Sequence, residues 1–360
     1  MRIGIVGLPN AGKSSLFNAL TASGAQTANY PFTTIEPNVA VAPVADPRLD
    51  RVAEVVGASE VAPDTIDFYD IAGLVADAHR GEGLGNQFLA HIRETDAIVH
   101  VVRCHGDERV VHPGGRVDPL ADVGIVEAEL LYADLDQVER RLERVRRQAR
   151  GGERRALTEK QWLEEVADAL RAGRPSRAVA PPPPAADAMR QLGLLTAKPV
   201  LFVANVEEGD DEVPPELSAH AHAAGAAAVA VCARLEAELA ELGSEEAATM
   251  REELGLREDG VERVVRAAFE LLGLIAFFTA DPGKPAMSRH LRRGMTAWDA
   301  AGMVHTDMQR GFVRAEVVDW GELVDAGGFA GARERGMLRV EGRDYQVADG
   351  NVLHFRFTPP

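Results

Sequence analysis

The sequence predicts an α/β fold with a parallel sheet, joined to an inserted helical hairpin and a smaller C-terminal α+β domain. Short apolar segments alternate with helical segments, a glycine-rich loop follows the first of them, and 360 residues suffice for two or three domains. The apolar segments span residues 2–6, 66–69, 97–102, 199–204 and 226–231. Because ligands bind beyond the carboxyl ends of parallel strands, we expect the site at those ends.

The loop after the first apolar segment reads GLPNAGKS at residues 7–14, the pattern G-x-x-x-x-G-K-S. Its glycines allow successive backbone N–H groups to point at one anion, and the helix that follows adds its positive dipole end. Lys13 is expected to reach the β- and γ-phosphates, and the Ser14 hydroxyl to ligate Mg²⁺. The pattern therefore predicts a nucleoside triphosphate site rather than an ordinary glycine-rich turn.

A second motif, D-x-x-G, runs from Asp70 to Gly73 at the end of the second apolar segment. In nucleotide switches, such an aspartate holds Mg²⁺ through water and the glycine N–H meets the γ-phosphate. Thr34 lies in an irregular segment before it and is expected to reach Mg²⁺ when the triphosphate is bound. Ordinary turn chemistry is the alternative for Thr34.

The stretch NVEE at residues 205–208 occupies the place of the guanine-reading motif N-K-x-D. Asn205 is retained, but Val206 replaces the lysine and Glu208 replaces the aspartate. The longer glutamate misplaces its carboxylate, and an unpaired buried hydrogen-bonding group costs about 1–3 kcal/mol. Guanine should lose its advantage, whereas adenine could use the backbone of Val206 and the side chain of Asn205. The alternative that Glu207 or Glu208 still reaches guanine stays open.

The chain divides into three predicted parts. A long helical pattern from residue 125 to about 170 predicts a hairpin, and the proline-rich stretch after it predicts an extended linker. We expect a nucleotide-binding domain at 1–124 and 197–273, an inserted arm and linker at 125–196, and a C-terminal domain at 274–360.

The formal net charge of −17 disfavours diffuse binding to nucleic acid, and no DNA partner is expected. Eight arginines nevertheless crowd one segment: Arg140, Arg141, Arg144, Arg146, Arg147, Arg150, Arg154 and Arg155. They form either a solvated helix face or an arm that faces RNA.

The sequence predicts a cytoplasmic protein without disulfides, membrane span or signal peptide. It contains two separate cysteines and no long apolar stretch, and its start runs directly into a strand.

Together these residues resemble the Obg-like ATPase family, also called YchF. The resemblance covers nearly the whole chain and rests on GLPNAGKSS (7–15), NYPFTTIEPN (29–38), DIAGLV (70–75), GEGLGNQFLAHIRETDAIVHVVRC (81–104), ANVEE (204–208), CARLEAELAEL (232–242) and GRDYQVADGNVLHFRF (342–357). It implies a P-loop ATPase related to translation factors, with a C-terminal TGS domain of the β-grasp type.

The resemblance also implies roles for single residues. The phosphate-binding residues would be Asn10, Ala11, Gly12, Lys13, Ser14 and Ser15. Ser14 and Thr34 would ligate Mg²⁺, Val206 would contact adenine through its main chain, and Ala233 would lie in the loop behind the base. Asn10 stands where related loops can hold a monovalent ion, so a K⁺ requirement is left open.

Catalysis is expected to be slow. Leu74 occupies the position at which Ras-like proteins carry a water-orienting glutamine, and its side chain cannot form that hydrogen bond. By resemblance, His112 would act instead, since a neutral imidazole can accept a hydrogen bond from water. A purely structural histidine is the alternative. One departure lies in the C-terminal domain, where His290 replaces a frequent tryptophan and suggests a changed partner surface.

The motifs therefore predict a slow, monomeric ATPase switch that prefers ATP to GTP, and the resemblance implies that it associates with ribosomes or ribosomal subunits. Two alternatives are an Obg-type GTPase in ribosome assembly and a nucleotide-dependent binding scaffold in which hydrolysis is incidental.

Overall fold

The computed structural model describes residues 1–26, 38–71, 84–106, 115–151, 153–256 and 258–358. These residues form two compact units, one made of 1–42 and 67–267 and the other of 43–66 and 268–360. The segment 43–66 thus belongs to the second unit, although the sequence analysis grouped it with the nucleotide-binding domain. Among the described helices, none combines the length and apolar character that a membrane span needs.

The first unit is built on a six-stranded sheet in the order β2-β4-β1-β5-β6-β7. The strands are β1 (Arg2–Val6), β2 (Val39–Pro43), β4 (Thr65–Asp70), β5 (Ala97–Arg103), β6 (Val200–Asn205) and β7 (Ala227–Val231). The pairs β4–β1, β1–β5, β5–β6 and β6–β7 are all parallel, which confirms the predicted fold class. The strand β2, in which half-buried and buried residues alternate, was not predicted.

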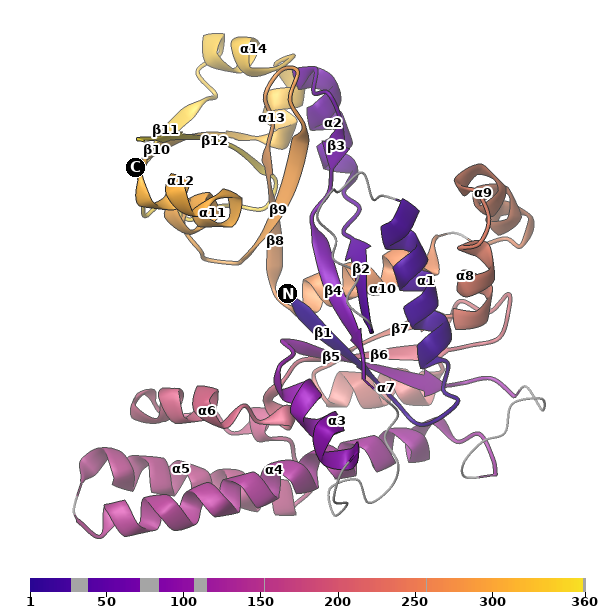
Figure 1. Cartoon of the computed structure of the whole chain (residues 1–360), viewed down its shortest axis with the longest axis vertical. Coiled ribbons are helices and arrows are strands. Elements are labelled where there is room, and N and C mark those ends of the chain that lie inside the picture. The colour runs from indigo at the N-terminus through magenta and orange to yellow at the C-terminus, as the bar shows by residue number, and fades with distance from the viewer. Residues whose placement is uncertain (27–37, 72–83, 107–114, 152, 257, 359–360) are drawn as a thin grey trace. The chain divides into compact units, whose positions relative to one another are not determined.

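Helices and short helical turns complete the first unit, as Figure 1 shows. They are α1 (Lys13–Gln26), α3 (Leu84–Arg93), α4 (Pro119–Ala149), α5 (Arg154–Arg171), η1 (Ser176–Ala178), η2 (Pro183–Ala185), α6 (Ala186–Leu192), η3 (Leu195–Ala197), α7 (Pro215–Ala223), α8 (Ala233–Leu239), α9 (Ser244–Glu253) and α10 (Gly260–Leu271). Helix α10 runs on into the second unit.

The predicted hairpin is confirmed as α4 and α5, which lie side by side in Figure 1. Apolar residues at helical spacing form its core around Trp162, with Val138, Leu142 and Val166 fully or almost fully buried. The proline-rich stretch packs on this core instead of hanging free, because Ala185 is buried in it and the Trp162 indole N–H donates to the carbonyl oxygen of Val179 at 3.3 Å.

The second unit has its own six-stranded sheet, ordered β11-β10-β12-β8-β9-β3. Its elements are α2 (Pro47–Val56), β3 (Val61–Ala62), β8 (Leu274–Thr279), β9 (Ala286–Arg292), α11 (Ala297–Val304), α12 (Thr306–Arg310), β10 (Phe312–Asp319), α13 (Trp320–Asp325), α14 (Phe329–Glu334), β11 (Arg339–Glu341) and β12 (Asn351–Phe357). This mixture of strands and helices confirms the expected α+β domain.

Both faces of the second sheet are buried, as the alternation along β8 demonstrates. Phe277 packs with α11 on one face, whereas Phe278 packs with α2 on the other. Since successive side chains of a strand point to opposite faces, each face needs its own covering helices. Segment 43–66 supplies one of those helices and the edge strand β3.

One buried carboxylate fixes the base of the arm. Asp134 of α4 has no exposed surface and accepts hydrogen bonds from the Leu195 N–H at 2.8 Å, the Thr196 N–H at 2.8 Å and the Thr196 hydroxyl at 2.7 Å. Burial raises the pKa of Asp134, and the three donors oppose that shift. The arm helix is thereby tied to η3, the turn that leads into β6.

We expect Asp134→Ala to lower the free energy of unfolding of the first unit by about 3 kcal/mol, because two buried N–H groups lose their acceptor. Urea denaturation monitored by tryptophan fluorescence measures this change. Asp136→Ala, on the exposed face of α4, is the matched control and should change stability by no more than about 0.5 kcal/mol. Equal effects of the two variants would contradict the role given to Asp134.

Candidate nucleotide site

The glycine-rich loop joins β1 to α1 in a conformation that demands its glycines. Gly7 and Gly12 have φ values of 152° and 101°, and Asn10 is left-handed at 63°. A Cβ on Gly7 would lie 2.4 Å from the carbonyl oxygen of Val101, and one on Gly12 would lie 2.2 Å from Nδ2 of Asn205. Only glycine therefore allows the loop to approach β5 and β6 so closely.

Lys13 is the first residue of α1 and is held inside the loop. The residue is 8% exposed, and Nζ donates to the carbonyl oxygen of Leu8 at 2.8 Å. Burial lowers the pKa of Lys13, while the negative charge of Asp70 at the end of β4 opposes this shift. The ammonium group is thus a partly desolvated cation that lies against the loop, where a phosphate would supply a stronger partner.

Asn205 at the end of β6 connects two loops. Its Nδ2 donates to the carbonyl oxygen of Ala11 at 3.0 Å, and its Oδ1 accepts from the N–H of Ala233 at 3.0 Å. These two bonds fix the orientation of the amide and link the phosphate loop to the start of α8, directly after β7. Both polar atoms of the side chain are engaged, which makes Asn205 a positioning residue in this structure.

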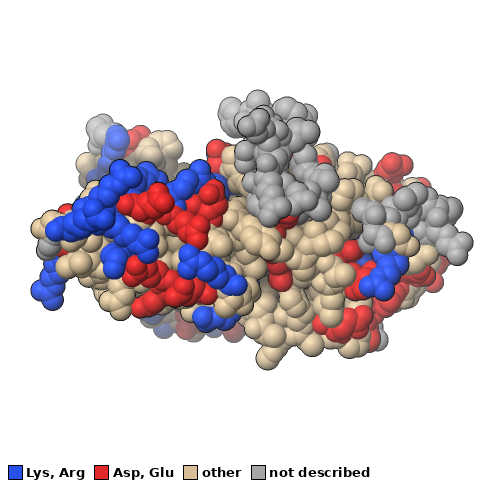
Figure 2. Space-filling model, turned by 90° about the horizontal axis from the view of Figure 1, so that it is seen from below, with Lys and Arg blue, Asp and Glu red and all other residues tan. Residues whose placement is uncertain are grey.

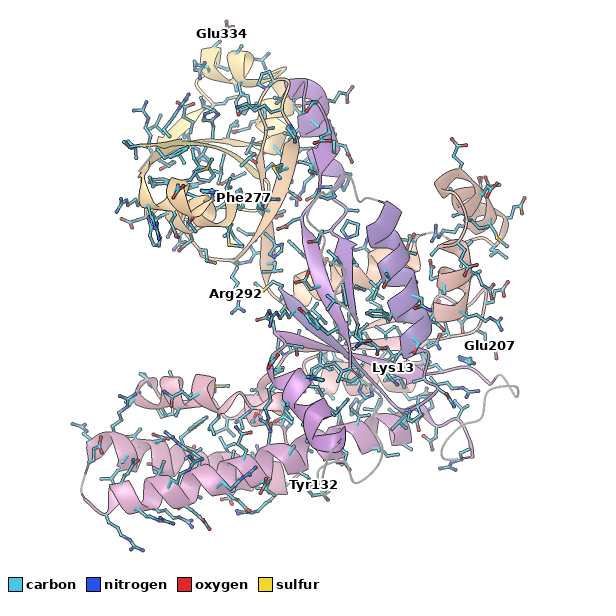
Figure 3. All side chains as sticks on the ribbon, viewed as in Figure 1. Lys13, Tyr132, Glu207, Phe277, Arg292 and Glu334 are labelled. Carbon is cyan, nitrogen blue, oxygen red and sulfur yellow. The ribbon has the colours of Figure 1, made fainter. Side chains whose placement is uncertain are left out.

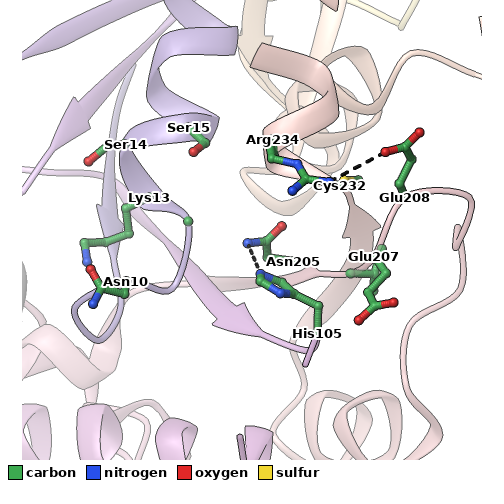
Figure 4. Close-up of a pocket in the computed structure, with 12 residues that line it drawn as sticks. Asn10, Lys13, Ser14, Ser15, His105, Asn205, Glu207, Glu208, Cys232 and Arg234 are labelled. Carbon is green, nitrogen blue, oxygen red and sulfur yellow. Dashed lines mark hydrogen bonds and ion pairs between the residues drawn. The ribbon is translucent and has the colours of Figure 1, made fainter. Parts of the chain in front are cut away.

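A histidine that the sequence analysis left without a role lies beside this amide. Nε2 of His105 is 3.4 Å from Nδ2 of Asn205 (Figure 4). Because Nδ2 is the donor in its bond to Ala11, it can also donate to Nε2 of His105 in the tautomer that carries no proton on that nitrogen. His105 follows β5, so the rule that sites form at strand ends was the signal that could have identified it.

The opposite wall of the site carries the base-reading stretch. The N–H of Val206 donates to the carbonyl oxygen of Val231 at 3.1 Å. Glu207 Oε1 accepts from the N–H of Gly106 at 3.2 Å, and Glu208 Oε2 lies 3.6 Å from the Arg234 guanidinium. Neither glutamate is left without a partner inside the protein.

These loops enclose one pocket of about 580 Å³, within the usual range for small-ligand sites. It is lined by Asn10, Gly12, Lys13, Ser14, Ser15, His105, Asn205, Val206, Glu207, Glu208, Cys232 and Arg234. The structure therefore gathers most of the predicted site residues, and Ala11 and Ala233 join them through Asn205. Lys13 and Glu207, labelled in Figure 3, lie at this end of the first sheet. Gly73, Thr34 and His112 lie outside the described residues.

The oxygen atoms near Lys13 fit a hard divalent cation. Ser14 is exposed at the start of α1, and Asp70 ends β4 close enough to act on the charge of Lys13. A hydroxyl and a carboxylate, with phosphate oxygens and water, are the ligands that Mg²⁺ prefers. Within the described ranges, no cluster of three or more His, Cys, Asp or Glu forms a metal cage, so any metal here would depend on the bound phosphates for most of its ligands.

We expect Asn205→Asp to weaken nucleotide binding about tenfold or more, because a carboxylate oxygen would face the carbonyl of Ala11 in place of an N–H donor. Isothermal titration with ATP and ADP measures the affinity. Asn18→Asp on the exposed side of α1 is the matched control and should leave the affinity unchanged. Equal affinity of the Asn205 variant and the unsubstituted protein would show that the hydrogen bond from Asn205 to Ala11 does not position the phosphate loop.

Comparison with known proteins agrees with this site. Residues 2–130 match a family described as 50S ribosome-binding GTPase, and residues 274–358 match the YchF GTPase C-terminal family, described as a protein of unknown function. The chain is 46% identical over 359 residues to a protein of Haemophilus influenzae named ribosome-binding ATPase YchF, with 99% of each chain covered. It is 44% identical over 360 residues to the Bacillus subtilis protein of that name, with 98% of each covered.

A solved structure described as the Schizosaccharomyces pombe YchF GTPase superimposes with a TM-score of 0.87 and 30% identity, covering 99% of this chain and 97% of that one. A GTP-binding protein from Pyrococcus horikoshii shares the fold, with a TM-score of 0.63 at 20% identity. Since sequence and structure agree over nearly the whole length, the chain belongs to the YchF family.

Proposed function

We propose that this protein is a slow ATP-hydrolysing switch that binds ATP in preference to GTP and associates with the ribosome in the cytoplasm. Family membership supports the general activity, because the Haemophilus and Bacillus relatives are named ribosome-binding ATPases. The residues of this chain support the finer assignments, which concern the phosphates, the purine, the hydrolytic water and the ribosome.

The phosphates would bind in the loop from Asn10 to Ser15, where backbone N–H groups and the start of α1 favour an anion. Lys13 would exchange its bond to Leu8 for the phosphate oxygens. Ser14 and Asp70 would hold Mg²⁺, joined in our proposal by Thr34, and Gly73 would meet the terminal phosphate. The metal would neutralise charge on the phosphates and orient them.

The arrangement on the purine side carries the proposed preference for ATP. The N–H of Val206 already donates to Val231, and among the described residues no donor reaches its carbonyl oxygen. That oxygen can accept from the amino group of adenine but would face the O6 acceptor of guanine. Glu208, which would have to bind guanine, instead lies beside Arg234. Both features disfavour guanine.

The proposed rate of hydrolysis is low because Leu74 has no polar group to orient water. We assign that task to His112, as the family resemblance implies. Asn10 stands where related loops can hold a monovalent ion, and phosphate release measured with KCl and with NaCl tests a K⁺ requirement.

Ribosome association is supported by an excess of positive charge at the tip of the arm. Several hairpin arginines are neutralised by acids of the same hairpin: Arg140 by Asp136, Arg141 by Glu159, and Arg146 by Glu164. By contrast, the exposed Arg147, Arg150 and Arg154 have no acidic partner within the described part of the hairpin. Figure 2 shows Lys and Arg gathered over the hairpin with acidic side chains between them. Unpaired guanidinium groups suit a phosphate backbone.

Competition between ATP and GTP for a fluorescent nucleotide analogue tests the central assignment. We expect ATP to displace the analogue at a concentration at least about tenfold lower than GTP, since discrimination by misplaced polar groups costs about 1–3 kcal/mol. Equal displacement, or displacement by GTP at the lower concentration, would overturn the ATP preference. Phosphate release measured with the same protein tests hydrolysis separately.

Glu208→Asp should raise the affinity for GTP relative to ATP by about tenfold, because the shorter side chain withdraws from Arg234 and restores the guanine-reading carboxylate. The same competition assay measures the ratio. Glu207→Asp is the matched control: it shortens a neighbouring carboxylate of the same pocket that serves Gly106. A GTP-to-ATP ratio that responds equally to both variants would contradict the role of Glu208.

The double variant Arg147→Gln/Arg150→Gln should weaken ribosome binding and reduce the slope of log K against log salt by about 0.9 for each phosphate that is no longer neutralised. Ribosome pelleting at several salt concentrations measures both quantities. The control is Arg146→Gln/Arg171→Gln, which removes the same charge from arginines that already have acidic partners. If both doubles weaken binding alike, the unpaired arginines have no special role.

A further inference from the structure

A second hollow lies in the first unit, away from the nucleotide pocket, between α3 and α4. It has a volume of about 460 Å³. Its lining residues are Leu89, Ala90, Arg93, Tyr132, Ala133, Asp136, Gln137 and Arg140. Helix α4 is the root of the arm, so this α3–α4 groove lies at the base of the arm.

The groove combines an apolar floor with an aromatic side chain at its rim. Leu89 and Ala133 are buried at 5% and 6% exposure and pack into the core of the first unit. Tyr132 is 53% exposed and lies on the outer side of α4, where Figure 3 labels it. An exposed ring beside an apolar floor can stack on a flat partner and shield it from water.

Arg93 supplies a cation in the same groove. It is half-buried, and its guanidinium donates to the carbonyl oxygen of Gly193 at 3.2 Å, while Gln137 donates to that of Leu192. Burial lowers the pKa of Arg93, with the nearby charges of Asp134 and Asp136 opposing the shift. No carboxylate of the described residues lies within ion-pair distance of Arg93. A partly desolvated cation with only carbonyl partners favours an anionic ligand.

The groove also continues into the arginines of the arm. Tyr132, Asp136 and Arg140 follow one another at intervals of one helical turn, and Arg144 and Arg147 extend the line toward the tip. From Tyr132 to Arg150 this line measures about 27 Å, at about 1.5 Å per residue. An aromatic platform at one end of a row of guanidinium groups is the pattern of single-stranded nucleic acid sites.

We propose that the α3–α4 groove binds an unpaired RNA nucleotide, with its base stacked on Tyr132 and a neighbouring phosphate against Arg93. The phosphates that follow would lie along Arg144 and Arg147 of the arm. The proposal rests on the proposed ribosome association and names the RNA feature that would be recognised. Asp136, whose charge the Arg140 guanidinium offsets, can accept hydrogen bonds from the amino groups of a base. The carboxylate side chains of an acidic peptide offer neither such a donor nor a flat ring for Tyr132.

Fluorescence anisotropy of the full chain with a labelled, mixed-sequence single-stranded RNA of twelve nucleotides tests the assignment. Tyr132→Ala should weaken binding about tenfold, the effect typical of removing the stacking partner of one base. Tyr132→Phe should keep the wild-type affinity because the ring remains. Leu157→Ala, an exposed apolar residue of α5 in the same hairpin, is the matched control and should have no effect. RNA containing 4-thiouridine should cross-link to the peptide that contains Tyr132.

Three results would overturn the proposal. Unchanged RNA affinity of Tyr132→Ala would exclude stacking, and so would equal binding of single- and double-stranded RNA by wild type and variant. Weaker ribosome pelleting by Tyr132→Ala with unchanged RNA affinity would identify a protein as the occupant. ATP affinity and phosphate release, measured on the same variants, should stay at wild-type values. If the proposed ATPase function is wrong, ATP binding or phosphate release will be absent in the wild type as well, while the RNA titration will be unaffected.

Discussion

The nucleotide site depends on one side-chain amide. Asn205 holds the phosphate loop through Ala11 and the loop behind the base through Ala233, so a shift in either loop is passed to the other. This tie requires the absence of a side chain at Gly12, because a Cβ there would lie 2.2 Å from the amide nitrogen. The Asn205 amide would therefore connect the loop that binds the phosphates with the loop that lies behind the base.

Much of the fold was predictable because its signals are local. The strand ends, the glycine loop and the helical hairpin are encoded by patterns of a few residues, and these predictions are confirmed. Part of the site geometry was also predictable, since Lys13, Asn205 and Glu208 all follow strands of one parallel sheet and line one pocket. The roles of these residues stay predictions. His105 obeyed the same rule but carried no motif, and the ion pair between Glu208 and Arg234 depends on a loop geometry that no short pattern encodes.

The features that could not be predicted from the sequence are contacts between residues that lie far apart along the chain. His290 was expected to alter a surface, but this was wrong: the side chain is 6% exposed, and its Nδ1 lies 2.6 Å from Oδ2 of Asp64. Burial by itself would raise the pKa of Asp64, yet the histidine charge and the N–H of His290 hold it below its usual range. The partners are separated by more than two hundred residues, so neither position suggests the other. Asp134 and Thr196 form a similar pair at the base of the arm.

The origin of α2 and β3 has a consequence for how this chain can be divided. Leu49 and Val52 of α2 cover the face of the second sheet that carries Phe278 and Val318, and the backbone of residues 59–60 bonds to Lys284 and Ala286 beside the edge strand. A fragment that begins near residue 268 would lack α2 and β3. It would therefore expose the apolar face of the second sheet to solvent and leave β9 as an unpaired edge strand. Residues 268–360 alone therefore do not make up a complete domain. Gene fusions or truncations that treat them as one would yield an incomplete fragment that is prone to aggregate.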